Sequence, residues 1–327
     1  MKTKILYALS SDPDDFYAEQ LFVSVVSLKK NSPGVSVSVI TDQATKNGLN
    51  ERGPMGPKLI QIVDEWIVVT LDPSLPKEFR SRLLKTGMRQ YIDGDFLYID
   101  SDTIIAAPLD NIDHYPYELA LCPDHHCTLQ ENPEKKWVRD KCMKLGEDLS
   151  GCEYYFNSGV ILARDTTDVR NLFVNWQNYY IQGRNNGVKT DQQSLAKTIN
   201  SSEFHIDQLE GKWNCQLPYG VRHMGEALIF HYFSGSYVNP DHPLYLLNDK
   251  DILNRIRNSE LLPDEVSAVI DDFFKGFPKV SLLIDEYEML FRTTRRYNDI
   301  FRNFVPGKFS FLESLLKLRA RLPFKKK

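Results

Sequence analysis

The sequence predicts an α/β protein with a largely parallel sheet that helices cover on both faces. Short apolar strand patterns alternate with helical patterns over the first hundred residues, and this βαβ order is typical of parallel sheets. The chain has 327 residues, of which 42% are hydrophobic, so it can bury a large core as two domains or as one large domain with an appendage. From about residue 250 the strand patterns stop and charge-rich helical segments follow.

The individual elements follow from the spacing of apolar residues. Strands are predicted, in chain order, at 4–9 (KILYAL), 35–41, 65–70, 96–105 (FLYIDSDTII), 117–122, 154–163 and 227–233. Helices are predicted at 17–30, 79–92, 166–181 and 190–200, where apolar residues recur every three or four positions. The last two of these helices have a Thr or Asp near their start as an N-cap.

Charge and cysteine content exclude several classes of protein. The net charge of −4 gives no sign of the positive surface that binds nucleic acid. No apolar run approaches the roughly 20 residues of a membrane span. The first residues predict a strand of a cytoplasmic protein rather than a signal peptide. Five cysteines, an odd number, favour reduced thiols over a disulfide framework. The stretch CPDHHC at 122–127 raises the question of zinc, but its spacing matches no common structural site, which favours free cysteines on a loop.

The most informative stretch is FLYIDSDTII, which places two aspartates inside an apolar strand pattern. Asp-x-Asp occurs four times in the chain, but only Asp100 and Asp102 lie between apolar β-forming residues. Residues two apart on a strand point the same way, so both carboxylates would converge beyond the carboxyl end of a strand, where α/β sheets bind ligands. Such a pair suits Mg²⁺ or Mn²⁺. The alternative is a structural pair that caps backbone amides or binds Lys85 or Arg89.

Several segments, in the same order, resemble the GT-A-fold glycosyltransferases, and within them family eight, which includes glycogenin and lipopolysaccharide galactosyltransferases. These segments are YALSSDPDDFYAEQL, RSRLLKTGMRQYI, LYIDSDTII, FNSGVILA, TDQQSL, KWNCQ and IFHYFSGS, and they span about residues 4–240. The resemblance implies a Rossmann-like mixed sheet flanked by helices, with a helical C-terminal extension. The expected division is a catalytic domain at 1–245 and a helical region at 246–327.

The resemblance also implies roles for individual residues. Asp100 and Asp102 would bind Mn²⁺ or Mg²⁺ with His231 as a third ligand, although a histidine after an apolar run is more often structural. The expected donor-binding residues, which would border base, ribose, diphosphate or sugar, are Ala8, Ser10, Tyr17, Lys85, Arg89, Ser101 and Asn157. Asp191 and Gln192 would face the reacting carbon. Each role has a plainer structural alternative. Ala8, Ser10 and Tyr17 would be ordinary residues at a strand end and a helix start. Lys85 and Arg89 would lie on a solvated helix face, and Asp191 would be a helix N-cap.

The chain departs from the family pattern after its histidine. The family has a Gly and then Lys-Pro-Trp there, whereas HYFSGSYVNP has no lysine. The phosphate charge would then be neutralised by Lys85, Arg89 or Arg222. The segment at about 123–153 is long and Cys/His-rich, so the acceptor site is expected to be particular to this protein.

The function that the resemblance implies is metal-dependent transfer of a sugar from a nucleotide sugar, a UDP-sugar, to a glycan or lipid-linked acceptor in surface-polysaccharide synthesis. Family eight implies a retaining reaction, but Asp191 and Gln192 fit an inverting one as well. The alternatives are a non-catalytic nucleotide- or carbohydrate-binding protein and, less favoured, a phosphohydrolase with the same Asp-x-Asp pattern. A sugar-nucleotide pyrophosphorylase is disfavoured because SSDPDDF, after the first strand, has neither glycine nor a basic residue.

The last residues predict a contact with a membrane surface. Apolar residues at 311, 312, 315, 316 and 322 fall near one helical face, and six cations lie between 317 and 327 without an acid. An amphipathic basic helix at 309–327 would place the protein on the inner face of an anionic membrane. The alternative is a solvated tail.

Overall fold

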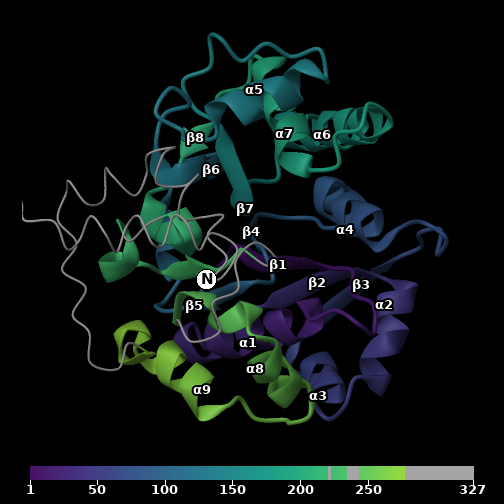
Figure 1. The fold of residues 1–327 in the computed structure, drawn as a ribbon, viewed down its shortest axis with the longest axis vertical. Coiled ribbons are helices and arrows are strands. Elements are labelled where there is room, and N and C mark those ends of the chain that lie inside the picture. Colours follow the sequence, from purple (N-terminus) through teal and green to yellow (C-terminus); the bar gives the residue numbers. More distant parts are fainter. Residues whose placement is uncertain (220–221, 234–242, 277–327) are drawn as a thin grey trace, which may run out of the picture. The chain divides into compact units, whose positions relative to one another are not determined.

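The computed structural model describes residues 1–219, 222–233 and 243–276 (Figure 1). They belong to one compact unit that spans Met1–Leu282. The predicted amphipathic helix at 309–327 lies outside the described residues. Among the described helices, none is long and apolar enough to cross a membrane.

The main sheet has seven strands in the order β3-β2-β1-β4-β7-β6-β8. Their bounds are β1 (Lys4–Leu9), β2 (Val37–Asp42), β3 (Glu65–Val69), β4 (Phe96–Ile99), β6 (Leu119–Pro123), β7 (Phe156–Ala163) and β8 (Asp207–Gln208). The four neighbouring strands β3, β2, β1 and β4 are parallel to one another. β7 is antiparallel to both β4 and β6, and β8 is parallel to β6. The predicted mixed sheet flanked by helices is therefore confirmed.

A second, three-stranded sheet has the order β5-β10-β9. It consists of β5 (Thr103–Ile105), β9 (Cys215–Gln216) and β10 (Ile229–His231). β10 is antiparallel to β5 and parallel to β9. The predicted strand at 227–233 thus exists, but it belongs to this small sheet.

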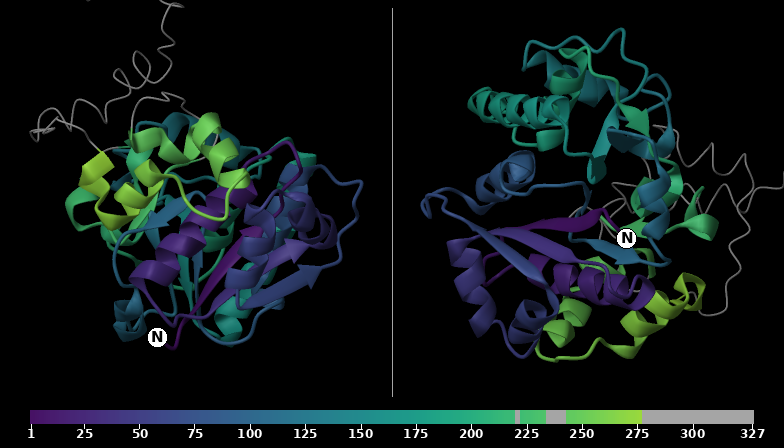
Figure 2. Two further views of the ribbon diagram at one scale, coloured as in Figure 1. Left: turned by 90° about the horizontal axis from the view of Figure 1, so that it is seen from below. Right: turned by 180° about the vertical axis from the view of Figure 1, so that it is seen from behind.

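Helices cover the main sheet on two faces (Figures 1 and 2). They are α1 (Tyr17–Asn31), α2 (Gln43–Gly48), α3 (Met55–Ile62), α4 (Lys77–Thr86), α5 (Lys135–Met143), α6 (Thr167–Asn185), α7 (Asp191–Asn200), α8 (Lys250–Arg257) and α9 (Asp264–Asp271). Alternate strand residues divide the core, because successive side chains point to opposite faces. Ile5 and Tyr7 of β1 pack with α1, α3, α8 and α9, whereas Leu6 packs with α4, α6 and α7.

FLYIDSDTII is not a single strand, and this prediction was wrong. β4 ends at Ile99 and β5 begins at Thr103, and the two strands belong to different sheets. The chain crosses from one sheet to the other through Asp100, Ser101 and Asp102. The apolar residues on both sides enter the core, and the aspartates lie in the connection, where the Asp100 N–H donates to the carbonyl of Gly159 (2.8 Å) and the Asp102 carbonyl accepts from Tyr232 N–H (2.9 Å).

The helix predicted at 79–92 is also shorter than expected. α4 ends at Thr86, and a separate turn of 3₁₀-helix follows at Met88–Gln90. Gly87 is the C-cap of α4, and the Gln177 side chain of α6 lies close to it: a Cβ there would lie 2.4 Å from Nε2 of Gln177. Periodicity continues through this break, so the sequence pattern gives no sign of it.

The predicted helical character beyond residue 250 is confirmed for α8 and α9. Leu253 and Ile256 of α8, and Val266 and Ile270 of α9, are buried in the same core cluster as α1 and the strands. Hydrophobic burial therefore joins residues 246–273 to the sheet. The division of function at residue 245 stays a prediction.

We expect Leu253→Ala to destabilise the protein by about 2–4 kcal/mol, since it removes buried methyl groups and leaves a cavity. Leu253 is 2% exposed, whereas Leu261, between α8 and α9, is 77% exposed. Leu261→Ala is the matched control and should change the free energy of unfolding by less than about 0.5 kcal/mol. Urea denaturation measures both. Equal effects of the two variants would contradict the packing of α8 in the core.

Candidate functional site

The strand order creates a place for a ligand at one edge of the main sheet. The chain leaves β1 through α1 on one face and enters β4 through α4 on the other, so the order reverses between these neighbouring parallel strands. Ligands bind at such switch points, beyond the carboxyl ends of the strands. Ser10 follows β1, Asp42 ends β2 and Asp100 follows β4 at this edge.

Asp100, Asp102 and His231 converge at this edge. One ligand atom from each lies within 4.8 Å of the others. His231 Nε2 is 3.3 Å from Oδ1 of Asp102 and 3.9 Å from Oδ2 of Asp100. The small sheet produces the meeting, because β10 pairs His231 with Thr103, directly after Asp102. Among the described residues, this is the one group of three acidic, His or Cys side chains placed to hold a metal ion.

A chain of amide groups fixes which nitrogen of His231 faces the aspartates. Asn157 Nδ2 donates to Oδ1 of Asp124 (3.1 Å), so Asn157 Oδ1 accepts, and Asn214 Nδ2 donates to it (2.9 Å). Asn214 Oδ1 must then accept from Nδ1 of His231, at 2.9 Å. A neutral imidazole with its proton on Nδ1 has a lone pair on Nε2. This donor set of two carboxylates and an oriented imidazole fits Mn²⁺ or Mg²⁺.

Gly159 makes room for the His231 ring. A Cβ at this residue of β7 would lie 2.1 Å from Cε1 and 2.6 Å from Nδ1 of His231. The glycine of FNSGVILA is therefore needed because of a close approach between β7 and β10.

A partly buried cluster of opposite charges includes Asp100 of the aspartate pair. Lys85 Nζ bonds both carboxylate oxygens of Asp100, at 2.9 and 3.0 Å, and lies 3.6 Å from Oδ2 of Asp191. Arg82 Nε is 2.8 Å from Oδ1 of Asp191, and the Ser158 hydroxyl donates to Oδ2 at 2.9 Å. Burial by itself would raise the pKa of Asp191, but Lys85, Arg82 and Ser158 together lower it to about 2.

Most of the predicted site residues line one cavity of about 260 Å³. They are Lys85, Asp100, Asp102, Asn157, Asp191, Gln192 and His231. The cavity has a further wall that sequence reasoning did not identify, formed by Asp124, Glu134, Trp137, Tyr155, Tyr219 and Phe233. Arg82 was missed too: it lies one helical turn before Lys85 and so on the same face of α4, which the i, i+3 spacing could have suggested.

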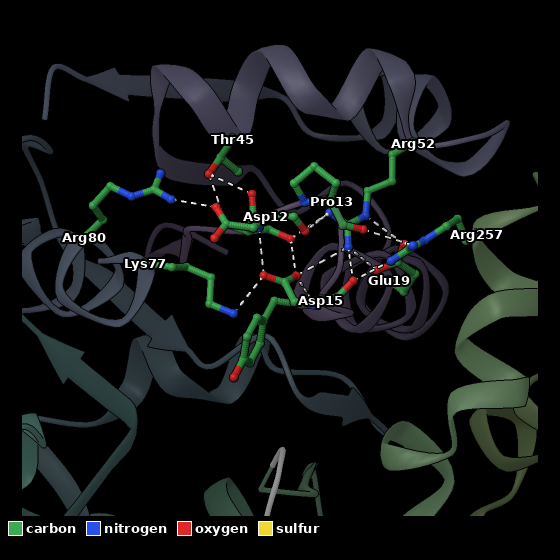
Figure 3. Close-up of polar contacts among 11 residues, drawn as sticks. Asp12, Pro13, Asp15, Glu19, Thr45, Arg52, Lys77, Arg80 and Arg257 are labelled. Atoms are coloured by element: carbon green, nitrogen blue, oxygen red, sulfur yellow. Dashed lines mark hydrogen bonds and ion pairs between the residues drawn. The ribbon is translucent and has the colours of Figure 1, made fainter. Parts of the chain in front are cut away.

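Ala8, Ser10 and Tyr17 lie at the carboxyl end of β1 and the start of α1, outside the cavity lining. Ala8 is half-buried, and the Ser10 hydroxyl donates to Oδ2 of Asp42 at 2.9 Å. Lys77 Nζ lies 4.7 Å from the centre of the Tyr17 ring. Ser101 is half-buried between the two aspartates. Figure 3 shows the loop between β1 and α1 and the ion pairs around it.

The structure does not bring Arg89 to this site. Its guanidinium is buried and donates to the carbonyl oxygens of Gly94 (2.7 Å) and Ala163 (3.0 Å). Ala163 pairs with Phe96, the first residue of β4, whereas Asp100 follows the last. Arg89 therefore lies at the opposite end of β4 and holds backbone groups there. The other suggested cation, Arg222, contacts the carbonyl of His126 and is outside the cavity lining.

The structure bears on two of the plainer interpretations, those for Asp191 and for Asp100. The residue at the N-cap of α7 is Thr190, and the Asp191 side chain binds Arg82 and Ser158. The alternative in which Asp100 pairs with Lys85 describes a real contact, since Lys85 is 3% exposed and bonds this carboxylate. That contact places a cation beside the candidate metal ligands.

The Cys/His-rich segment contributes aromatic surface. His125 and His126 both have positive φ angles, of 58° and 53°. The His125 ring stacks on Tyr219 with centroids 3.4 Å apart, and Tyr219 lies edge-on to Phe233. All five cysteines are free thiols.

We expect Gly159→Ala to displace His231 and weaken Mn²⁺ binding by about 10–100-fold, as losses around metal ligands commonly do. Gly151→Ala is the control, because a Cβ at Gly151 meets no atom within 4 Å. Titration calorimetry with Mn²⁺ measures both. Unchanged Mn²⁺ affinity in folded Gly159→Ala would contradict a role for His231 in holding the metal.

The lowered pKa of Asp191 predicts a pH-dependent stability. The pKa of Asp191 is about 2 in the folded protein, against 3.8 ordinarily, so its ionised form stabilises the fold above pH 4. This stabilisation is lost as the pH falls towards 2. Asp191→Asn should therefore cost about 2 kcal/mol or more at pH 7, since one pKa unit is about 1.4 kcal/mol. The difference from the wild type should shrink below pH 4, as measured by urea unfolding. Asp140→Asn, at an exposed aspartate of α5, is the control; a pH-independent deficit in Asp191→Asn would contradict the ion-pair assignment.

Comparison with known proteins gives a clear answer for the fold. No family model and no curated protein sequence matches the chain. Solved structures do match. The bifunctional glycosyltransferase WbbM, in its apo form, superposes with a TM-score of 0.53 at 13% identity; the match covers 89% of this chain and 51% of WbbM. An active-site mutant of LgtC, described as a galactosyltransferase, superposes with a TM-score of 0.51 at 16% identity, covering 84% of this chain and 99% of LgtC.

This chain thus spans about half the length of WbbM and nearly the whole length of LgtC. At such identities the likeness concerns the fold. The chain has the GT-A fold of nucleotide-sugar glycosyltransferases, as its sequence motifs predict.

Proposed function

We propose that this protein is a metal-dependent glycosyltransferase that moves a sugar from a UDP-sugar to a glycan or lipid-linked acceptor in surface-polysaccharide synthesis. One observation carries the proposal. Asp100, Asp102 and His231 converge at the switch point of a GT-A fold, in the same cavity as Lys85 and Asp191. His231, held by Asn214 through its Nδ1, brings a third ligand atom to the two carboxylates.

Asp100, Asp102 and His231 would hold the cation, Mn²⁺ or Mg²⁺. When bound, the metal supplies Lewis-acid stabilisation of the negative charge on the leaving diphosphate. The chain itself orients His231 through Asn214 and Asn157. It also holds Asp100 through Lys85.

Lys85 and Arg82 are the described cations best placed to stabilise the leaving diphosphate. Both line the cavity, and both already bind carboxylates there. Positive groups fixed before the reaction stabilise developing charge without reorganisation. We propose that they replace the lysine that the family has after its histidine.

Asp191 and Gln192 would face the donor sugar. Because Lys85 and Arg82 hold the pKa of Asp191 at about 2, its carboxylate is a weak proton acceptor at neutral pH. An inverting reaction that used Asp191 as its base would be slow. We propose a retaining reaction in which Asp191, held by Arg82 and Ser158, orients groups around the sugar and the half-buried Gln192 offers its amide to the reacting face.

The second wall of the cavity supports a carbohydrate acceptor. Trp137 is 46% exposed there, beside Tyr219 and Phe233. Asp124 and Glu134 lie on the same wall. Aromatic faces pack against the apolar faces of sugar rings, while carboxylates accept hydrogen bonds from hydroxyl groups.

The test is a thermal-shift panel of nucleotide sugars with and without Mn²⁺. We expect a UDP-sugar to stabilise the protein only with the metal, by about 2.7 kcal/mol at one hundred times its Kd. Asp102→Asn should abolish this stabilisation. Asp251→Asn is the matched control, because it changes an exposed aspartate of the Asp249/Asp251 pair, another of the four Asp-x-Asp tripeptides.

Product analysis then separates the outcomes. Transfer to an acceptor with an unchanged anomeric configuration, observed by NMR, supports the proposal in full. Metal-dependent binding without hydrolysis or transfer would identify a binding protein. If no nucleotide sugar stabilises the protein with any divalent metal, the proposed function is wrong.

A further inference from the structure

The loop at 11–16, between β1 and α1, is held mainly by guanidinium groups from elsewhere in the chain (Figure 3). Arg52 donates to the carbonyl oxygens of Asp12 (2.9 Å) and Asp15 and to the Ser11 hydroxyl (2.9 Å). Arg257 donates to the carbonyl oxygens of Pro13 (3.1 Å) and Asp15. Two side chains thus bind three carbonyl groups of the loop backbone, those of Asp12, Pro13 and Asp15.

Glu19 joins the two arginines. Its carboxylate, in the first turn of α1, is fully buried. Oε1 accepts from Nε of Arg52 and from Nε of Arg257, both at 2.7 Å, and Oε2 accepts from Nη2 of Arg52 at 2.9 Å. A buried carboxylate is costly unless it is paired and hydrogen-bonded, so Glu19 needs both arginines, and its two oxygens hold their guanidinium groups side by side.

Arg257 is the last residue of α8 and lies 238 residues from Glu19 in the sequence. Figures 1 and 2 show α8 beside α1, on the face of the sheet that α3 also covers. The approach is close: a Cβ at Gly53 would lie 2.4 Å from the carbonyl oxygen of Arg257. Gly53 has a φ of +61°, which glycine adopts without strain. The end of α8 is therefore packed tightly against the segment that carries Arg52.

The loop needs these cations because it is strongly acidic. SSDPDD carries three aspartates in four residues, at the edge of the sheet where an anionic diphosphate would approach. Arg80 pairs with Asp12 at 2.6 Å, and Lys77 pairs with Asp15 at 3.0 Å, both from α4. Arg52 and Arg257 hold the opposite side of the loop. Without them the carboxylates would repel one another and the approaching ligand.

We propose that Arg257 is a positioning residue of the donor site and that α8, through it, sets the affinity for the nucleotide. This inference rests on the proposed function, which places the nucleotide at the carboxyl end of β1. Arg257 acts through the loop and not on the reacting atoms. The helical region after residue 245 is then part of the donor site.

The experiment compares three variants in the full chain, with UDP and Mn²⁺ as the calorimetric probe. Arg257→Gln should weaken UDP binding and raise the donor KM about tenfold, the size of one lost charge-assisted hydrogen bond, with kcat little changed. Arg257→Lys keeps the charge but offers one nitrogen where Arg257 uses three, one each for Glu19, Pro13 and Asp15, so its UDP affinity should fall between those of the wild type and Arg257→Gln. Arg255→Gln, on the same helix, is the matched control: its side chain is 56% exposed and pairs with Glu265.

Hydrogen exchange of residues 11–17 in the free protein gives a readout that does not depend on any ligand. We expect faster exchange in Arg257→Gln and the wild-type rate in Arg255→Gln. If the wild type binds no UDP but Arg257→Gln still loosens the loop, the proposed function fails and the donor-site role fails with it, whereas the contact by which Arg257 holds the loop is confirmed.

Wild-type UDP affinity or wild-type exchange at 11–17 in Arg257→Gln would overturn the proposal. An equal loss in Arg255→Gln would also overturn it, because the effect would not be specific to the loop contact. Should Arg257→Gln fail to fold, Arg257→Lys decides: wild-type UDP affinity in that variant rejects the proposal.

Discussion

The fold of the candidate site depends on one crossing of the chain, between Ile99 and Thr103, from the large sheet to the small one. The crossing takes Asp100 and Asp102 out of the strands and leaves their apolar neighbours in the core. It also starts β5, whose antiparallel partner β10 delivers His231 to the same point. Two carboxylates so close together need positive charge, and the neighbouring groups are arranged around that requirement.

Two layers of polar groups meet this requirement. Lys85 binds Asp100, and Arg82 binds Asp191, so these two carboxylates each have a cation within hydrogen-bond distance. Next to them, a chain of hydrogen bonds runs from Asp124 through the amides of Asn157 and Asn214 to the His231 ring, and it fixes the orientation of that ring. The same principle operates at the end of β1, where Glu19, Arg52 and Arg257 hold an acidic loop. At both places each of these buried or half-buried carboxylates is paired with a lysine or an arginine.

The sequence predicted the site best where the evidence came from residues close together in the chain. Strand patterns and their order predicted the sheet, and the apolar context of Asp100 and Asp102 separated them from three other Asp-x-Asp tripeptides. His231 was found by resemblance. Arg89 was misplaced because a helix pattern was extended through Gly87, where α4 ends. The loop SSDPDD has no basic residue of its own, yet four cations reach it from distant segments, namely Arg52, Lys77, Arg80 and Arg257.

The sequence by itself determined the α/β class, the order of the main elements and the residue types available for a metal and an anionic ligand. These properties follow from periodicity and composition, which act over a few residues. Only the tertiary structure decided that FLYIDSDTII is divided between two sheets, and that Arg82 and Lys85 hold Asp191 ionised. It also decided that Arg257 contacts a loop over two hundred residues earlier in the chain. Such contacts depend on which strands and helices become neighbours, and no local pattern specifies that.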